Sequence, residues 1–177
     1  FELGKDLTQQ LFELSEETDF VAFKNTLYLK LAQNFLNYRW LLTYLYGASS
    51  LAEKGFLSEE VGCVRSIRNS KHGYVNAEDV HISFSSLEQY VVDIEQAVQS
   101  GQLSAEKEFY SSVRLRGAKT SRDFLSKGIS YLEFRTFDLN PYDPFAISQE
   151  TLDTVHLFLL ALLWLDQLAD VDNALTK

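Results

Sequence analysis

A run of alternating side chains in the last third of the chain carries the residues best suited to chemistry. From Ile129 to Asp138, the side chains of a strand would point alternately to opposite faces. Glu133 and Arg135 therefore share one face, roughly 7 Å apart at about 3.3 Å per residue. A carboxylate beside a guanidinium suits a site for a metal ion and a phosphate group. A cross-strand ion pair on a solvated surface has the same pattern, so both interpretations stay open.

A second segment, Glu106–Arg116, alternates in the same way. Its two faces differ sharply in polarity, as expected for a sheet with an apolar back and a charged front. Such a front is ordinary where it meets water and less ordinary where the sheet curves around a cavity. The polar face would hold Glu106, Glu108, Tyr110, Ser112, Arg114 and Arg116, and the apolar face Phe109, Val113 and Leu115.

Elements that would position these strands can be read from hydrophobic periodicity and capping residues. The segment Val155–Leu165 is apolar on nearly all sides, which predicts a buried helix. Together with the strands, the helical patterns indicate an α+β protein. Helices are expected at Leu7–Leu14, Asp19–Tyr46, Leu87–Gln99, Thr120–Lys127 and Ser148–Leu168, and further strands at Val61–Asn69 and Val80–Phe84.

Composition limits the function classes. The chain has 177 residues, enough for one domain or part of one, and its net charge of −9 argues against a nucleic-acid surface. One cysteine permits no internal disulfide, and the longest apolar run is nine residues, where a membrane span needs about 20. We therefore expect a cytoplasmic protein without membrane contacts. A start at Phe1 in a chain without methionine indicates a piece of a longer polypeptide.

Four segments, in order, resemble glutamate–cysteine ligase of the bacterial type. The resemblance covers about Leu27 to Asp166, and no single motif in it is decisive, but four in order are strong. The chain is most similar to the ligase portion of bifunctional glutathione-synthesising enzymes, in which an ATP-grasp domain follows. The matching segments are Tyr38–Ser49, Arg68–Tyr74, Glu108–Arg114 and Tyr131–Pro141.

The resemblance implies a glutamine-synthetase-like fold, in which a curved antiparallel sheet cups the active site and helices lie outside. It also implies a reaction: ATP phosphorylates the γ-carboxylate of L-glutamate, and the amine of L-cysteine attacks the acyl phosphate. Residues 1–177 would form the C-terminal part of this catalytic domain. Phosphoryl transfer between anions needs a divalent metal and fixed cations, so the implied cofactor is Mg²⁺, with Mn²⁺ as an alternative.

The resemblance also implies site residues. Glu133 matches a carboxylate ligand of Mg²⁺, a hard cation that prefers oxygen. Arg135 matches the catalytic arginine on the transferred phosphate, which a planar guanidinium can engage at two oxygens. The implied substrate-binding residues are Arg68, Tyr74, Tyr110 and Arg114.

The resemblance also implies that the family's other metal ligands and part of the nucleotide site lie before Phe1, and one carboxylate cannot hold several magnesium ions. The chain alone would then be inactive. Two rival interpretations remain: another carboxylate–amine ligase of the same superfamily with a different acceptor amine, and a non-catalytic helical scaffold whose charged strands are merely solvated.

Overall fold

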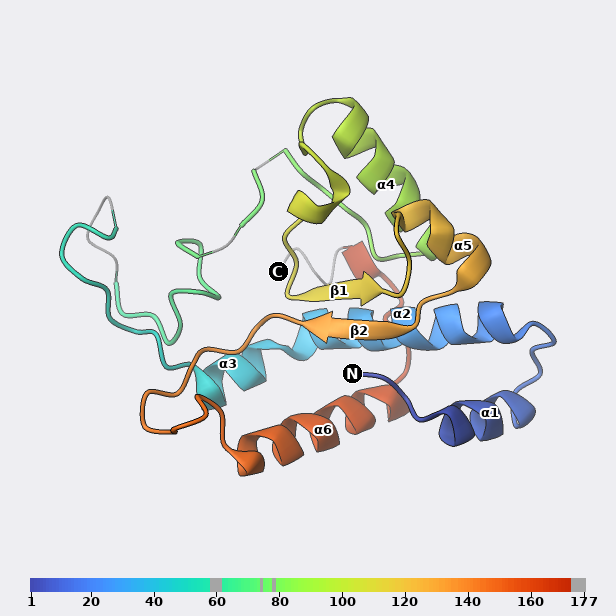
Figure 1. The fold of residues 1–177 in the computed structure, drawn as a ribbon, viewed down its shortest axis with the longest axis horizontal. Helices are drawn as coiled ribbons and strands as arrows, with labels where there is room; N and C mark the ends of the chain where they lie inside the picture. Colours follow the sequence, from blue (N-terminus) through green and yellow to red (C-terminus); the bar gives the residue numbers. More distant parts are fainter. Residues whose placement is uncertain (58–61, 74, 78, 173–177) are drawn as a thin grey trace.

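The computed structural model describes residues 1–57, 62–73, 75–77 and 79–172 and has the α+β character expected from the sequence (Figure 1). Tyr74 lies outside the described residues. The helices and strands are α1 (Lys5–Glu13), α2 (Phe20–Tyr38), α3 (Trp40–Tyr46), α4 (Leu87–Gln99), the 3₁₀-helix η1 (Glu106–Glu108), β1 (Val113–Arg116), the 3₁₀-helix η2 (Ser121–Asp123), α5 (Phe124–Lys127), β2 (Tyr131–Phe134) and α6 (Gln149–Trp164).

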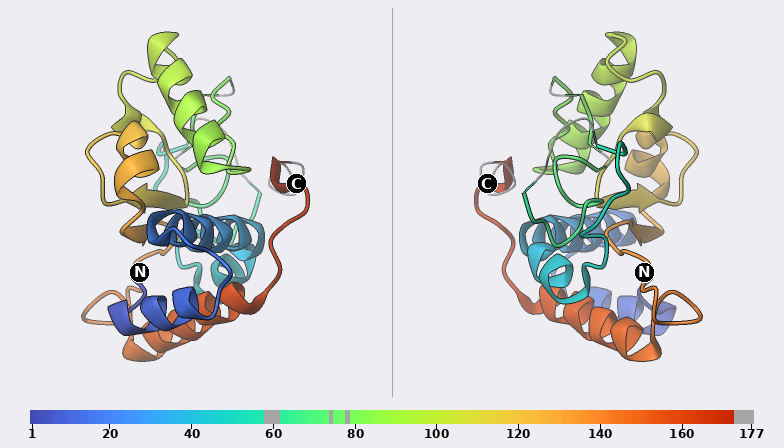
Figure 2. Two further views of the ribbon diagram at one scale, coloured as in Figure 1. Left: turned by 90° about the vertical axis from the view of Figure 1, so that its right-hand side faces the viewer. Right: turned by 90° about the vertical axis from the view of Figure 1, so that its left-hand side faces the viewer.

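Helix α2 forms the middle layer, with α6 on one side and the sheet with α4 and α5 on the other (Figure 2). Its inward positions are fully buried, among them Leu31 and Phe35. Two buried amides on the same helix tie it to distant segments. Gln33 Nε2 donates to Phe84 O at 2.7 Å, and Asn34 Nδ2 donates to Leu162 O at 2.9 Å. Helix α2 is therefore the frame on which the site-bearing segments are fixed.

Side-chain caps fix where several helices begin, as the sequence predicts. Asp19 accepts hydrogen bonds from the backbone N–H groups of Val21 and Ala22 at the start of α2. Ser86 and Ser148 do the same for the first turns of α4 and α6. Each cap satisfies backbone donors that the first helical turn leaves without partners.

The predicted continuous helix Asp19–Tyr46 is divided at Arg39. This residue ends α2 and precedes α3, yet its backbone stays helical, with φ −55° and ψ −24°. Its N–H donates to Phe35 O at 2.8 Å, and its carbonyl accepts from Thr43 N at 3.1 Å. The interruption is therefore local, and it sets the Arg39 side chain at the joint between the two helices.

The sheet in the described residues consists of β1 and β2, paired antiparallel with Arg114 opposite Glu133 and Leu115 opposite Leu132. Val113, Leu115 and Leu132 are buried, so the predicted apolar and polar faces are confirmed. The strands are shorter than predicted, because residues 106–108 form η1 and regular pairing ends at Phe134. On the outer edge of β2, Phe1 and Leu132 exchange two backbone hydrogen bonds of 2.7 and 2.9 Å.

The two further predicted strands are wrong in the part of the chain that is described. Residues 62–69 and 80–84 run as loops, although Ser66, Val80 and Phe84 are buried and so mimic the pattern of a strand. Side-chain hydrogen bonds, and not backbone strand pairing, connect the first loop to the segment that follows β2. Asn69 Nδ2, for example, donates to Thr136 O at 2.8 Å.

The prediction of a fully buried last helix is also wrong. Helix α6 buries Val155, Leu159 and Leu162 against the core, but Leu157 is 67% exposed and Trp164 89% exposed. Among the residues described, no helix is long and apolar enough to cross a bilayer.

Candidate functional site

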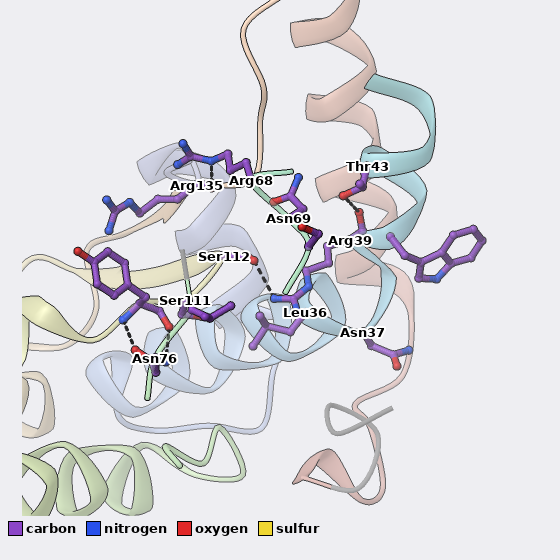
Figure 3. Close-up of a pocket in the computed structure, with 14 residues that line it drawn as sticks. Leu36, Asn37, Arg39, Thr43, Arg68, Asn69, Asn76, Ser111, Ser112 and Arg135 are labelled. Carbon is purple, nitrogen blue, oxygen red and sulfur yellow. Dashed lines mark hydrogen bonds between the residues drawn. The ribbon is translucent and has the colours of Figure 1, made fainter. Parts of the chain in front are cut away.

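Two adjoining cavities lie beside the sheet, and Arg68 and Arg135 line both of them. The first has a volume of about 660 Å³ and the second about 1200 Å³. We call the first the cationic cavity, because it is lined by Arg39, Arg68 and Arg135 and by no carboxylate among the described residues. Its other walls include residues with hydroxyl and amide groups, such as Ser112 and Asn76 (Figure 3). Tyr110 also lines it. Such a lining suits an anionic ligand with further polar groups.

Backbone hydrogen bonds hold Arg135 from both sides. Its N–H donates to Ser112 O at 2.8 Å, which extends the pairing of the sheet one step past β2. Arg68 Nε donates to Arg135 O at 3.0 Å. The guanidinium of Arg135 lies 5.9 Å from the centre of the Tyr110 ring, within cation–π range. The two arginines and the tyrosine that the sequence selected therefore come together in one place.

Asn76 positions Tyr110 through the backbone. Its Nδ2 donates to Tyr110 O at 2.7 Å, and its Oδ1 accepts from Tyr110 N at 2.8 Å. The amide side chain of Asn76 thus pairs with the backbone N–H and C=O of Tyr110, as the backbone of a neighbouring strand would. The result is a fixed aromatic wall for the cationic cavity.

Arg39 is a site residue that the sequence analysis did not select. It is half-buried, and Nη1 donates to Ser112 Oγ at 2.7 Å. Burial lowers the pKa of its guanidinium below the usual value, because the charged form loses hydration. None of the ion pairs in the described part of the chain involves Arg39. The one signal in the sequence is an arginine inside the apolar helical pattern, within the Tyr38–Ser49 segment.

Glu133 lines the second cavity but not the cationic one. Its Oε2 forms an ion pair with Arg116 at 2.6 Å, whereas Oε1 lies 4.0 Å from Arg135 Nε. The carboxylate is therefore part of a cross-strand ion pair, with Arg116 as its close partner. The described residues contain no cluster of three or more His, Cys, Asp or Glu side chains that could hold a metal. Among these residues, Glu133 is therefore a candidate ligand and not part of a complete metal site.

Arg114 is not brought into the site by the described structure. Arg114 lies on the polar face of β1, but Nη2 donates to Lys107 O at 2.9 Å and the residue lines neither cavity. Burial, and then the nearby charges of Arg116 and Arg135, lower its pKa. Tyr74 is outside the described residues, so its predicted role stays a prediction.

Asp138 fastens the end of α3 to the segment that follows β2, at the wall of the second cavity. Its Oδ2 accepts from Ala48 N, Ser49 N and Ser49 Oγ at 2.8–3.1 Å. Burial pushes the pKa of this carboxyl up, but hydrogen bonds from Ala48, Ser66 and Ser49 outweigh burial, so the pKa lies below its usual value. These hydrogen bonds hold the segment after α3 against the segment after β2, which begins beside Glu133 and Arg135.

Helices around a short antiparallel sheet, with a cavity lined by three arginines beside it, define an α+β protein with a cationic cavity. The Glutamate-cysteine ligase family matches residues 1–104 and 99–174, and the chain belongs to this family. The resemblance seen in the sequence is thereby confirmed.

Curated relatives include two bifunctional proteins of glutathione biosynthesis named GshAB. The one from Streptococcus mutans is 65% identical over 177 residues, which is 99% of this chain and 24% of the relative. The one from Pasteurella multocida is 47% identical over 179 residues, 98% of this chain and 24% of the relative. The chain thus spans about a quarter of the length of these relatives.

Solved structures agree with this assignment. A bifunctional glutathione synthetase from Pasteurella multocida superposes with a TM-score of 0.89 at 47% identity, over 98% of this chain and 23% of that one. A glutamate–cysteine ligase from Francisella tularensis, solved with AMP, gives a TM-score of 0.76 over 97% of this chain and 42% of that one. At 24% identity, the second likeness speaks for the fold alone.

Proposed function

We propose that this chain is part of an ATP-dependent ligase that joins the γ-carboxylate of L-glutamate to L-cysteine through an acyl phosphate, the first step of glutathione synthesis. The observation that carries the proposal is the cationic cavity, which three arginines line with no lining carboxylate in the described structure. In a chain of net charge −9, such a concentration of positive charge needs an anionic partner. Membership of the glutamate–cysteine ligase family supports the same conclusion.

Arg135 is assigned to the phosphate that is transferred. Its backbone is fixed by Ser112 and Arg68, so its guanidinium can meet developing negative charge without a reorganisation of the chain. Its position between the two cavities suits a group that acts where the phosphate meets the acceptor. Arg68 and Tyr110 are assigned to amino-acid substrates, and Tyr74 and Arg114 stay predicted members of the same set.

Glu133 is assigned to a divalent metal as one ligand of a larger set. Carboxylate oxygen is what Mg²⁺ prefers, and Mn²⁺ accepts the same donors. When bound, the metal would offset charge on the phosphate groups. Because the described residues contain no cluster of three or more His, Cys, Asp or Glu side chains that could hold a metal, the remaining ligands are assigned to other parts of the polypeptide.

The place of this chain in a larger protein is also a proposal. We assign residues 1–177 to the C-terminal part of a ligase catalytic domain with a glutamine-synthetase-like fold, in which β1 and β2 belong to a curved antiparallel sheet. The rest of the polypeptide, an N-terminal ligase half and a following ATP-grasp domain, is the expected macromolecular partner. The exposed apolar residues of α6 support such a partner. A cytoplasmic location stays a prediction.

Product formation by the full-length protein tests the proposed function. Phosphate release and formation of γ-glutamylcysteine should require ATP, glutamate, cysteine and a divalent metal together. Another ligase of the superfamily would release phosphate with a different amine and not with cysteine, and a scaffold would release none. Arg122→Gln is a suitable control variant, because Arg122 pairs with Glu95 away from both cavities.

A further inference from the structure

Arg39 differs from other arginines of the described structure in what surrounds its charge. Arg116 and Arg122 each lie within 2.6 Å of a carboxylate, and their side chains are 39% and 73% exposed. Arg39 is half-buried, and its side-chain hydrogen bond in the described structure goes to a neutral hydroxyl, Ser112 Oγ. A guanidinium carries five N–H donors, so most of them stay available to a ligand in the cavity. A partly desolvated charge that no protein carboxylate offsets is costly unless an anion joins it.

The position of Arg39 indicates which anion. It lines the cationic cavity together with Arg68 and Tyr110, the residues assigned to amino-acid substrates. It does not line the second cavity, where Glu133 and the proposed metal side of the reaction lie. Figure 3 shows its side chain reaching from the α2–α3 joint toward Ser112, on the cavity side of the helices. Arg39 therefore shares a cavity with the residues assigned to amino-acid substrates and does not share one with Glu133, the carboxylate assigned to the metal.

We propose that Arg39 binds the α-carboxylate of the acceptor amino acid. Ser112 orients Arg39 through its hydroxyl and Arg135 through its carbonyl, so one residue sets the spacing between the carboxylate-binding and the phosphate-binding arginines. A planar guanidinium can hold a carboxylate at both oxygens, which fixes the orientation of the acceptor amine. The inference rests on the proposed function and names a specificity residue for it.

The test pairs a change in the protein with a change in the substrate. Arg39→Gln and Arg39→Lys are made in the full-length protein, and ligation is measured with L-cysteine and with cysteamine, which lacks the carboxylate. We expect Arg39→Gln to lower kcat/KM for cysteine by about 10- to 100-fold, the size of a lost charged hydrogen bond. Activity with cysteamine should change less than about threefold, and Arg39→Lys should recover part of the loss because it keeps the charge.

Arg65→Gln is the matched control. Arg65 is exposed, donates to Tyr44 O in α3 and lines neither cavity, so its loss should leave both substrates unaffected. Equal losses with cysteine and cysteamine in Arg39→Gln would mean a structural role and overturn the proposal. A rise confined to the KM of ATP would assign Arg39 to phosphate and overturn it equally.

A binding measurement separates this inference from the proposed function. Calorimetric titration of L-cysteine and of cysteamine, with glutamate and a non-hydrolysable ATP analogue present, needs no turnover. If the wild-type protein made no γ-glutamylcysteine, the proposed function would fail, while selective loss of cysteine binding in Arg39→Gln would still support carboxylate recognition. Unchanged cysteine binding in that variant would refute the role of Arg39 whatever the wild-type activity.

Discussion

At the scale of single residues, Glu133 has to satisfy two partners. Arg116 holds Oε2 at 2.6 Å, and the proposed function asks the same carboxylate to bind a cation. A carboxylate has two oxygens and about four lone-pair sites, so both can be met if the cation binds at Oε1. Arg116 would then orient Glu133 rather than compete for it. The surface ion pair and the metal ligand, which the sequence left as alternatives, are compatible in this geometry.

Replacing Glu133 with Gln keeps the shape of the side chain but removes the negative charge. In the full-length protein we expect the metal concentration for half-maximal activity to rise at least about tenfold, with a large fall in turnover. A magnesium titration of ligation activity measures both. Glu95→Gln is the control, because Glu95 pairs with Arg122 in a similar ion pair outside the cavities. An unchanged magnesium requirement in Glu133→Gln would contradict the assignment.

Arg135→Lys tests the division of labour between the arginines. Lysine keeps the charge but loses the planar fork that engages two oxygens, and it interacts differently with the Tyr110 ring. We expect kcat to fall by about 100-fold, as when a preorganised donor is removed, while the KM of glutamate changes little. Steady-state kinetics with each substrate varied in turn provide the measurement. A variant with normal kcat and altered ATP KM would place Arg135 in nucleotide binding instead.

At the scale of elements, Asp138 connects the segment after β2 to the segment after α3 through its hydrogen bonds with Ala48 and Ser49. Asp138→Asn keeps the shape but loses the charge that strengthens the bonds from Ala48 and Ser49. We expect a loss of about 1–3 kcal/mol in stability. Because the folded pKa of Asp138 is lowered, its contribution is complete above the usual aspartate pKa of about 3.9 and is lost as the pH falls through the lower folded value.

Thermal unfolding of the wild type and of Asp138→Asn, followed from pH 7 down into acid, measures this contribution. The difference in Tm between the two should be constant in the neutral range and shrink below about pH 4. Glu17→Gln, an exposed carboxylate-to-amide change between α1 and α2, serves as the control. A difference that grew in acid would show that the hydrogen bonds do not favour the ionised carboxyl.

Sequence patterns predicted elements well where the deciding contacts are local. Ser86 and Ser148 mark helix starts through bonds to backbone groups three residues away, so both starts are visible in the sequence. The alternating pattern at residues 62–69 and 80–84 predicts strands, but both segments are loops in which tertiary contacts, and not a ladder, bury Ser66 and Val80. Such contacts do not register in a local pattern.

In the candidate site too, residues that follow a local pattern can be predicted from the sequence, and residues that depend on distant contacts cannot. Alternation predicts Glu133 and Arg135 on one face. The structure agrees, because Arg135 N–H continues the pairing to Ser112 O one residue past β2 and Arg135 Nε lies 4.0 Å from Glu133 Oε1. Arg39 was missed because its relevance depends on Ser112, 73 residues away in the chain. The contact of Asn76 with Tyr110 is likewise non-local, at 34 residues. Residues that act through folding partners cannot be found from spacing alone.

At the scale of the whole molecule, the exposed side of α6 is the feature least suited to water. Leu157 and Trp164 lie on that side, while Val155, Leu159 and Leu162 face the core. The sequence predicted burial on all sides, and the relatives are about four times as long as this chain. An apolar helix in a larger protein can be covered on its second side by other parts of the polypeptide. We therefore expect the full-length protein to bury this face.

Leu157→Lys in the full-length protein tests that expectation. A change at a solvated position costs within about 0.5 kcal/mol, whereas a charge placed in a packed interface costs several times more. We expect the Tm of Leu157→Lys to fall clearly, and the Tm of Val92→Lys to change little, because Val92 is an exposed apolar residue of α4 with no such neighbours on its helix. Equal, small effects at both positions would mean that α6 faces solvent in the complete protein and that its apolar side has no intramolecular partner.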